Sequence, residues 1–327
     1  MRAHLRGIPS LMIVALVVAA SAVPSFAGDE GHFDRTLAVT GAVDLTVQSG
    51  SGTITVRRGG SSEVEIHGTI HADHWQAGGN REARIQEIEM NPPIEQSGNT
   101  IRVGHFDDHD RERGISISYE LIVPSESKLR AESGSGGQTV EGIHGPVEAN
   151  TGSGSQRFRN IAGEVRARAG SGEIELNSIS GSVHATAGSG AIRALGIAGG
   201  LTASSGSGNI SLEQTSAGDV EISTGSGEIE IKGAKGAVKA TTGSGSIHAQ
   251  GQPGGEWCLR SGSGNVTAEL PNGAAFDLIA RSNSGHIETS HELNVEPTIN
   301  RSELRGKANG GGVLVDLTTS SGSINIR

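Results

Sequence analysis

The chain is poor in aromatic residues and in cysteine. Aromatic side chains make up 2% of its 327 residues, and Cys258 is the single cysteine. One thiol cannot form an internal disulfide, so disulfides are excluded as the scaffold. With so few large rings and 51 glycines, an ordinary globular core is hard to build, which leaves disorder or a repeat architecture. We expect Cys258 to be a small buried apolar residue.

Long hydrophobic runs are also scarce, and the one at the N-terminus has the features of an export signal. Arg2 and Arg6 precede an apolar run from Leu11 to Ala20, and Ser25-Phe26-Ala27 forms a small-residue cleavage site. The run is shorter than the roughly 20 apolar residues that a transmembrane helix needs. We therefore predict that residues 1–27 are a signal peptide, that the mature chain has no transmembrane segment, and that it is exported to the periplasm, the cell surface or the extracellular space.

Basic residues are outnumbered in the predicted mature chain. The signal contains two of the 26 basic residues and none of the 36 acidic ones, so 24 basic and 36 acidic residues remain and the formal charge is −12. A protein that binds the phosphate backbone of a nucleic acid needs a basic surface. The composition therefore excludes a nucleic acid as the expected partner.

Glycine is abundant, and its placement is periodic. The second glycine of each Gly-Ser-Gly unit recurs at intervals of 18 or 19 residues, at Gly136, Gly154, Gly172, Gly190, Gly208, Gly227, Gly245 and Gly264. Degenerate copies follow at Ser284-Gly285 and Ser321-Gly322. A flexible linker has no need of a fixed period, so this tract is a repeat architecture.

Apolar residues keep fixed places inside each repeat. Two residues after the reference glycine come Ile174, Ile192, Ile210, Ile229, Ile247 and Val266. A second glycine precedes alternating pairs such as Val165 and Ala167, or Val183 and Ala185. Alternation is the period of a strand, and two short strands can bury an apolar face only when copies stack. The sequence therefore predicts an all-β fold, a single-stranded parallel β-helix with coils of about 18 residues and irregular N-terminal capping strands.

The corners and the outer surface of these coils follow from the same repeat. We expect glycine at the corners because the chain turns sharply, often with positive φ, while neighbouring coils approach to about 4.8 Å. Serine suits a corner because its hydroxyl can bond a nearby backbone group. Two outward columns are predicted as solvated faces with partly alternating charge: Glu148, Arg166, His184, Thr202, Glu221 and Lys239, and Glu175, Arg193, Ser211, Glu230, His248 and Thr267.

The period divides the chain into three parts. After the signal, residues 28–132 form an N-terminal capping and opening β region, and residues 133–327 form the regular β-helix with an excursion near residues 290–310. In the N-terminal region we predict a helix from Arg81 to Glu87 and strands from Thr100 to Val103 and from Ile115 to Val123. The segment from Val313 to the end is predicted to complete the stack.

The repeated pattern resembles the exported "putative adhesin" family of the DUF4097 type. The resemblance runs from about Thr36 to Arg327 and includes the segments YELIVP at Tyr119 to Pro124 and GGGVLVDLTTSSGSINI at Gly310 to Ile326. It implies an exported β-helical protein with an adhesin-like role, and it supplies no catalytic residues. Fold alone does not define function.

Two histidine-bearing stretches are the candidate metal ligands. His67, His71 and His74 lie in HGTIHADHW, and His105 and His109 lie among aspartates in HFDDHDRE. Histidine and carboxylate can bind zinc or another divalent ion, but no complete metal signature is present, so solvated polar loops are the favoured interpretation. We assign no catalytic, cofactor-binding or metal residue and predict no cofactor. Trp257 is expected to pack in the core.

Two functions remain open at this point. The first is an exported β-solenoid that serves as a binding or structural surface, adhesin-like, with a cell-surface glycan or an envelope protein as partner. The alternative is a carbohydrate-active enzyme, a polysaccharide lyase or hydrolase, built on the same coil. Glycoside hydrolysis needs a pair of carboxyl groups at a defined separation, whereas the glutamates here are spread through the repeat. We therefore expect no catalysis.

Overall fold

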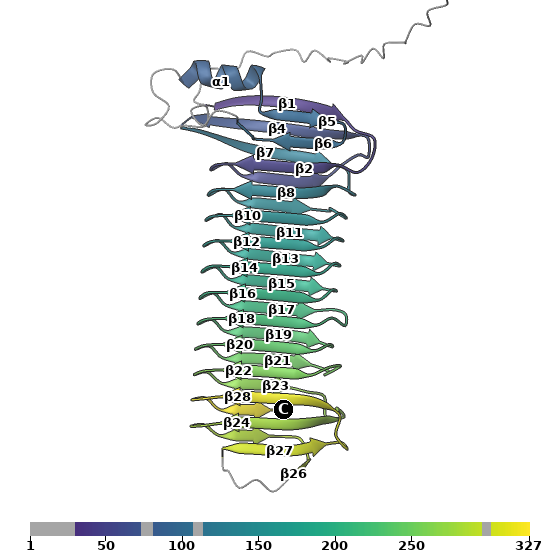
Figure 1. The fold of residues 1–327 in the computed structure, drawn as a ribbon, viewed down its shortest axis with the longest axis vertical. Coiled ribbons are helices and arrows are strands. Elements are labelled where there is room, and N and C mark those ends of the chain that lie inside the picture. Colours follow the sequence, from purple (N-terminus) through teal and green to yellow (C-terminus); the bar gives the residue numbers. More distant parts are fainter. Residues whose placement is uncertain (1–29, 73–80, 107–113, 296–301) are drawn as a thin grey trace, which may run out of the picture.

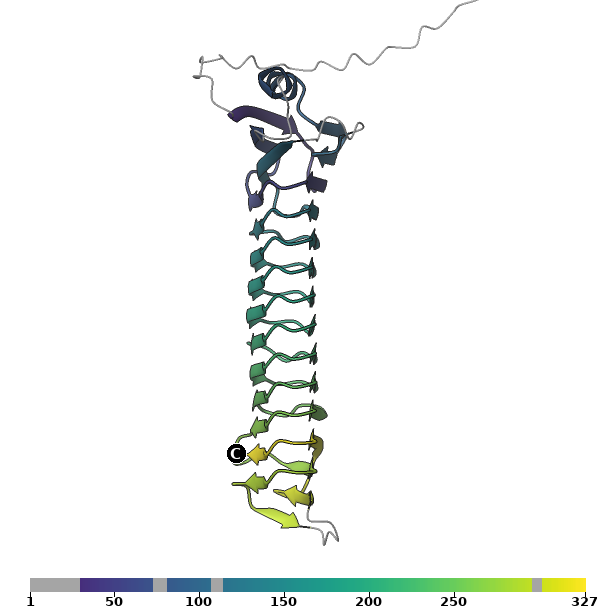
Figure 2. The same ribbon diagram turned by 90° about the vertical axis from the view of Figure 1, so that its left-hand side faces the viewer.

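The computed structural model describes residues 30–72, 81–106, 114–295 and 302–327, so the predicted signal peptide lies outside the described residues. The described chain is a straight rod of stacked coils (Figure 1). In the central part, each coil gives one strand to each of two sheets that face one another (Figure 2). The predicted all-β solenoid is confirmed.

Sheet A has 14 strands among the described residues. Their spatial order is β1 (Glu30–Ala38), β4 (Glu63–Ala72), β7 (Ile115–Val123), β3 (Ile54–Arg58), β9 (Gln138–Glu141), β11 (Gln156–Ile161), β13 (Ile174–Ile179), β15 (Ile192–Ile197), β17 (Ile210–Gln214), β19 (Ile229–Ala234), β21 (Ile247–Gly251), β23 (Val266–Glu269), β29 (Ile324–Ile326) and β25 (Ile287–Thr289).

Sheet B has 15 strands in the same part of the chain. Starting from the C-terminal end of the rod, their order is β26 (Leu293–Val295), β27 (Glu303–Ala308), β24 (Phe276–Ser282), β28 (Val313–Thr319), β22 (Trp257–Ser261), β20 (Val238–Thr242), β18 (Val220–Thr224), β16 (Leu201–Ser205), β14 (Val183–Ala187), β12 (Val165–Ala169), β10 (Val147–Thr151), β8 (Lys128–Ser133), β2 (Asp44–Ser49), β6 (Thr100–Val103) and β5 (Ile94–Ser97).

The central strands pair in parallel, each with its counterpart one repeat away. Val165 pairs with Val183, and Val183 pairs with Leu201. Their side chains alternate between the interior and solvent. In β12, β14 and β18 the first, third and fifth residues are buried and the second and fourth are exposed. The isoleucines predicted to face inward do so, since Ile174, Ile192 and Ile229 are fully buried and Ile210 is 1% exposed.

The interior is not wholly apolar near its N-terminal end. Gln138 and Gln156 occupy the place that isoleucine takes in later coils, and both are buried. Gln156 Nε2 donates to Gln138 Oε1 at 2.8 Å, and Gln138 Nε2 donates to the carbonyl oxygen of Asn150 at 2.8 Å. This amide ladder satisfies most of the polar atoms that it buries.

The corner glycines are required for close approach rather than for positive φ, which corrects one prediction. The φ angles of the reference glycines lie outside the left-handed region. A Cβ on Gly172 would instead overlap the carbonyl oxygen of Gly154 in the preceding coil, and the same holds at Gly190. Positive φ occurs at the other turn of the coil, in Gly142, Asn160, Ser178, Gly196 and Gly233.

The predicted corner hydroxyl is also supplied by a different residue. The serine inside each Gly-Ser-Gly unit is exposed, whereas the residue just before the unit is buried and makes the hydrogen bonds. Thr242 Oγ1 accepts from Gly245 N at 3.1 Å and donates to Gly227 O in the previous coil at 2.9 Å. Ser261 repeats both bonds at 2.8 Å. In two coils this position is Ala169 or Ala187, which cannot make them.

Both ends of the rod depart from chain order. At the N-terminal end, the coil of β2 and β3 lies between the coil of β6 and β7 and the coil of β8 and β9. At the C-terminal end, the coil of β28 and β29 lies between the coil of β22 and β23 and the coil of β24 and β25. The last coil in sequence is therefore not the outermost coil, which corrects the prediction that it completes the stack. Strand pairing on both sides protects it from fraying.

The caps at the two ends are antiparallel and irregular. At one end β1, β4 and β7 pair antiparallel, and α1 (Arg81–Met90) packs against β1 and β4 through the buried Ile85 and Ile88 (Figure 1). The helix begins where the sequence predicts and continues three residues beyond Glu87. The two strands predicted in this region are β6 and β7, with the predicted bounds. At the other end, β27 pairs antiparallel with β24 and β26.

Candidate functional site

The outward columns place charged side chains in ladders along the sheet faces. Glu148, Arg166 and His184 stand in register on β10, β12 and β14, as predicted. The ion pairs run partly across columns, because Arg168 Nη1 lies 3.2 Å from Glu148 Oε1, and Arg166 pairs with Glu164 at 2.8 Å. These pairs are exposed, and such pairs contribute only about 0.2–1 kcal/mol each. The ladders are solvated faces that favour register.

The histidine stretches do not form a metal site in the described residues. His67 Nδ1 lies 2.6 Å from Asp34 Oδ1, and His71 Nδ1 lies 3.3 Å from Glu30 Oε1, both on the outer face of the N-terminal cap. No cluster of three potential ligands is present in the part of the chain that the structure describes. His74 and His109 lie outside that part, whereas His105 follows β6.

Trp257 and Cys258 point to opposite sides of β22. Trp257 is fully buried, as predicted, and its Nε1 donates to Gly236 O at 3.1 Å. Cys258 is half-buried and faces outward between Lys239 and Asp316, so the prediction of a buried apolar thiol is wrong. Alternation along the strand forces this, because neighbours in sequence face opposite sides. Partial burial raises the pKa of the Cys258 thiol, which keeps it protonated at neutral pH.

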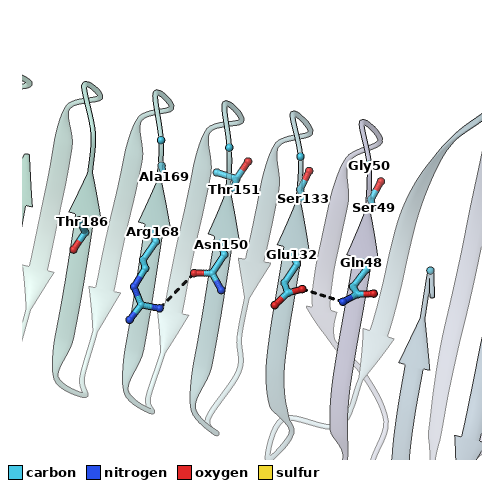
Figure 3. Close-up of a pocket in the computed structure, with 14 residues that line it drawn as sticks. Gln48, Ser49, Gly50, Glu132, Ser133, Asn150, Thr151, Arg168, Ala169 and Thr186 are labelled. Atoms are coloured by element: carbon cyan, nitrogen blue, oxygen red, sulfur yellow. Dashed lines mark hydrogen bonds between the residues drawn. The ribbon is translucent and has the colours of Figure 1, made fainter. Parts of the chain in front are cut away.

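A shallow groove on the outer face of sheet B is the strongest candidate for a binding site. It has a volume of about 610 Å³ and is lined by one polar side chain from each of β2, β8, β10, β12 and β14 (Figure 3), and by Gly104 directly after β6. These side chains are Gln48, Glu132, Asn150, Arg168 and Thr186. The first glycine of each adjoining corner forms its other wall, at Gly50, Gly134, Gly152 and Gly170. We call this site the polar groove.

Hydrogen bonds hold the long side chains of the polar groove in place. Gln48 Nε2 donates to Glu132 Oε2 at 2.9 Å, and Arg130 Nε donates to Glu132 Oε1 at 2.8 Å. Arg168 Nη1 lies 3.5 Å from Asn150 Oδ1 (Figure 3). The hydrogen bond from Arg130 is the main cause that holds the pKa of Glu132 below its usual range, so this carboxylate is ionised at neutral pH. The groove thus presents fixed donors and acceptors.

The sequence reasoning did not find the polar groove, although a signal was present. Glu132, Asn150, Arg168 and Thr186 share one place in the repeat, four residues before the reference glycine. Gln48 joins them only because the coil of β2 and β3 is threaded beside β8, which pairs Gln48 with Glu132. A search of every outward column would have marked these four residues, because they occupy the same place in consecutive repeats.

The fold and this site define a class: a parallel β-helix of two sheets with a polar exterior and a groove that crosses successive coils. The chain belongs to the DUF4097 family, described as Toastrack, whose model matches residues 44–327. No curated protein matches the chain. No helix among the described residues is long and apolar enough to cross a membrane.

Three solved structures are similar over most of their length. A "putative adhesin" from Bacteroides fragilis is 12% identical, with a TM-score of 0.33 over 90% of this chain and 97% of its own. A "putative adhesin" from Parabacteroides distasonis is 13% identical, with a TM-score of 0.32 over 92% and 98%. A "putative cell adhesion protein" from Clostridium sporogenes is 10% identical, with a TM-score of 0.24 over 91% and 98%. All three TM-scores are below 0.5, so the family membership rests on the sequence match alone.

Proposed function

We propose that the protein is an exported, adhesin-like binding rod whose polar groove contacts a cell-surface glycan or an envelope protein. The observation that carries this proposal is the groove itself, where five coils each place one polar side chain along a continuous hollow. Weak contacts that repeat on a rigid scaffold add together, because the later contacts form at high effective concentration.

The proposed export rests on the N-terminal sequence, which lies outside the residues that the structure describes. The N-terminal pattern of basic residues, apolar run and small residues is typical of an export signal. The absence of a disulfide requirement is compatible with any compartment, and the excess of acidic residues disfavours a nucleic acid as partner.

The ionisation of Glu132 disfavours the enzymatic alternative. A glycosidase needs one carboxyl group whose pKa is raised so that it can protonate the leaving oxygen. Glu132 is the carboxylate of the polar groove, and its hydrogen bonds from Arg130 and Gln48 lower its pKa instead. The neighbouring Glu148 is engaged by Arg168 and Arg130. Glu132 therefore lacks the raised pKa that a general acid needs.

The test is binding of the purified mature protein to envelope fragments of its source cell. We expect the wild type to co-sediment with the fragments and to release no reducing sugar. Asn150→Ala combined with Arg168→Ala should weaken binding, because it removes two side chains of the groove. The matched control is Glu221→Ala combined with Lys239→Ala, an exposed pair outside the groove, which should bind as the wild type does.

Equal binding by both double variants would place the contact elsewhere and overturn the role of the groove. Absence of binding by the wild type would overturn the proposed function. Release of reducing sugar that disappears in Glu132→Gln would support the enzyme instead.

A further inference from the structure

The threaded C-terminal coil, residues 313–327, follows a connection that passes from one side of β24 to the other. Its strands β28 and β29 lie between the coil of β22 and β23 and the coil of β24 and β25 (Figure 1). Strand β27, which precedes it in sequence, lies on the opposite side of β24. Ala308 and Val313 are both in register with Phe276, the first residue of β24. The connection of residues 309–312 therefore goes round the start of β24.

A second connection reaches the same edge of sheet B. Residues 270–275 lead from β23 into the start of β24, past the place that the threaded C-terminal coil occupies. The two connections touch, because Asn309 Nδ2 donates to Asn272 O at 3.1 Å and to Ala274 O at 2.9 Å. Connections at one edge of a sheet rarely cross each other. Insertion of the coil into its own chain therefore requires an unfavourable crossing at the start of β24.

The connection before β28 has the composition and backbone of a hinge. Asn309, Gly310 and Gly311 have φ angles of 48°, 91° and 84°, so three successive residues are left-handed, and Gly312 follows them. A Cβ on Gly310 would meet no atom within 4 Å, so packing does not hold this residue in place. Glycine loses more conformational freedom on folding than any other residue, which an extended connection would recover. Short, constrained hinge loops favour exchange of the element that follows them between two copies of a chain.

The place between β22 and β24 is specific for this coil. Val315 and Leu317 of β28 are fully buried between the two neighbouring coils. On the outer face, Asp316 contacts Arg260 of β22 at 3.5 Å and Arg281 of β24 at 3.2 Å. Two arginines thus flank the place where the coil supplies a carboxylate, which matches both register and charge.

A second copy of the chain can supply the same coil. Every contact described above is made with strands outside residues 313–327, so exchange between two copies recreates each of them. Extended, the five steps from Ala308 to Val313 span up to about 18 Å, which allows the coil to enter a second rod lying alongside. Exchange then costs the entropy of association but no buried contact.

We propose that the protein forms a dimer by exchange of the threaded C-terminal coil, so that residues 313–327 of each copy lie between β22 and β24 of the other. In this dimer residues 309–312 are extended and no longer pass round β24, which removes the crossing of the two connections within one chain. The partner is a second copy of this chain. The dimer contact is distant from the polar groove, whose side chains come from β2 to β14 near the other end of the rod (Figure 1).

The experiment detects exchange through a disulfide. The mature protein with Cys258→Ser, Arg260→Cys and Thr318→Cys is refolded at increasing concentration and then oxidised. Positions 260 and 318 are in register on adjacent strands, so they are close enough to cross-link. In a closed monomer the disulfide joins two parts of one chain, whereas exchange joins two copies. We expect a covalent dimer on a non-reducing gel, in a fraction that rises with concentration, and a dimer mass by light scattering.

The matched control moves one cysteine to a strand that is not exchanged. Thr241→Cys with Arg260→Cys in the same background pairs β20 with β22, and these positions are also in register. Both strands stay in one copy, so this disulfide should remain within one chain at every concentration. Covalent dimers at equal levels in the two variants would show non-specific cross-linking and would contradict exchange.

The length of the hinge gives a second test. Deletion of Gly310 and Gly311 leaves a connection too short to go round β24, and at equal protein concentration it should raise the ratio of dimer to monomer at least about ten-fold. Insertion of Gly-Ser-Gly after Gly311 relaxes the connection and should lower this ratio. Unfolding temperatures verify that the coils of both variants are intact.

The outcomes separate this inference from the proposed function. Exchange is ruled out if the disulfide between 260 and 318 stays within one chain at every concentration, or if the deletion variant is a monomer with the unfolding temperature of the wild type. If the deletion variant does not fold, the cysteine pair with the unaltered hinge decides. Binding to envelope fragments tests the polar groove independently of the oligomeric state.

Discussion

The central coils and the two ends of the rod differ in which coils pair with the edges of their strands. From β10 to β21, each strand pairs with the strands one repeat before and after it in sequence. At the ends, the coils of β2 with β3 and of β28 with β29 sit between coils that are distant in sequence. In the central part, each strand is paired on both sides by strands of the adjacent repeats. Threading gives the strands of the first and last coils a paired strand on both sides as well. Solenoids need such capping because an open end exposes core and backbone.

Breaking the interior of the central coils should have the largest effect. Ile210→Asp would place an unpaired carboxylate in the stacked core, where Ile210 is 1% exposed, and should lower the free energy of unfolding by about 4–5 kcal/mol. Thermal unfolding followed by circular dichroism measures the loss. The control is Ser211→Asp, on the outer face of the same strand, which should change stability by less than about 0.5 kcal/mol. Equal effects at both positions would contradict the assignment of inside and outside.

The close approach of the corners gives the next largest effect. Gly172→Ala would press a methyl group against the carbonyl oxygen of Gly154 and should cost about 1–3 kcal/mol. Gly273→Ala, where a Cβ meets no atom within 4 Å, is the matched control and should be near neutral. Denaturant unfolding of the two variants gives the comparison. A harmless Gly172→Ala would mean that the coils are further apart than described.

The threaded C-terminal coil is joined to both neighbouring coils by a carboxylate that is much less exposed than Glu221, which forms an ion pair between central coils. Asp316 on β28, with a side chain that is 14% exposed, contacts Arg260 of the coil before at 3.5 Å and Arg281 of the coil after at 3.2 Å. Asp316→Asn should cost about 1–2 kcal/mol and raise hydrogen exchange in β28 and β24. The central control Glu221→Gln breaks an exposed pair with Lys239 and should cost at most about 0.5 kcal/mol. Identical exchange in both variants would show that Asp316 does not hold the coil.

Two central coils have alanine where other coils have a buried serine or threonine just before the corner. Adding the hydroxyl there tests how much it stabilises a coil. Ala187→Ser gives the backbone N–H of Gly190 the acceptor that its counterparts have at Ser205 or Thr242. The variant should gain about 0.5–1 kcal/mol in the free energy of unfolding. Destabilisation in chemical unfolding would indicate that the corner at this coil has no room for the oxygen.

The smallest expected effect is the pH dependence at Glu132. Because the folded-state pKa of Glu132 is lowered, chiefly by the hydrogen bond from Arg130, its contribution is present above the usual carboxyl range and is lost as the pH falls below it. Glu132→Gln should therefore be a few tenths of a kcal/mol less stable than the wild type at pH 7, with the difference vanishing in acid. A difference that grows in acid would have the wrong sign.

The sequence predicts the central coils well because one repeat unit determines both their hydrogen bonds and their core. Ile174 and its counterparts face inward, and the columns from Glu148 and from Glu175 face outward, as alternation requires. Of the two reasons predicted for the corner glycines, close approach of the coils is confirmed at Gly172 and positive φ is wrong. The order of the coils in space could not be predicted from the periodicity of the sequence. The repeat shows which residues form each coil, but not which coils lie beside it. In the polar groove, threading hides only the contact of Gln48 with Glu132, whereas the other four side chains share one place in the repeat.

The most direct test of threading is a set of disulfide cross-links in a Cys258→Ser background. On sheet B, Thr318 is in register with Arg260 on one side and with Arg281 on the other. Cysteine pairs at 260 and 318, and at 281 and 318, should form disulfides on mild oxidation, whereas the pair at 260 and 281 should stay reduced because β28 lies between them. Rapid cross-linking of 260 to 281, with none from 318, would contradict the threaded order.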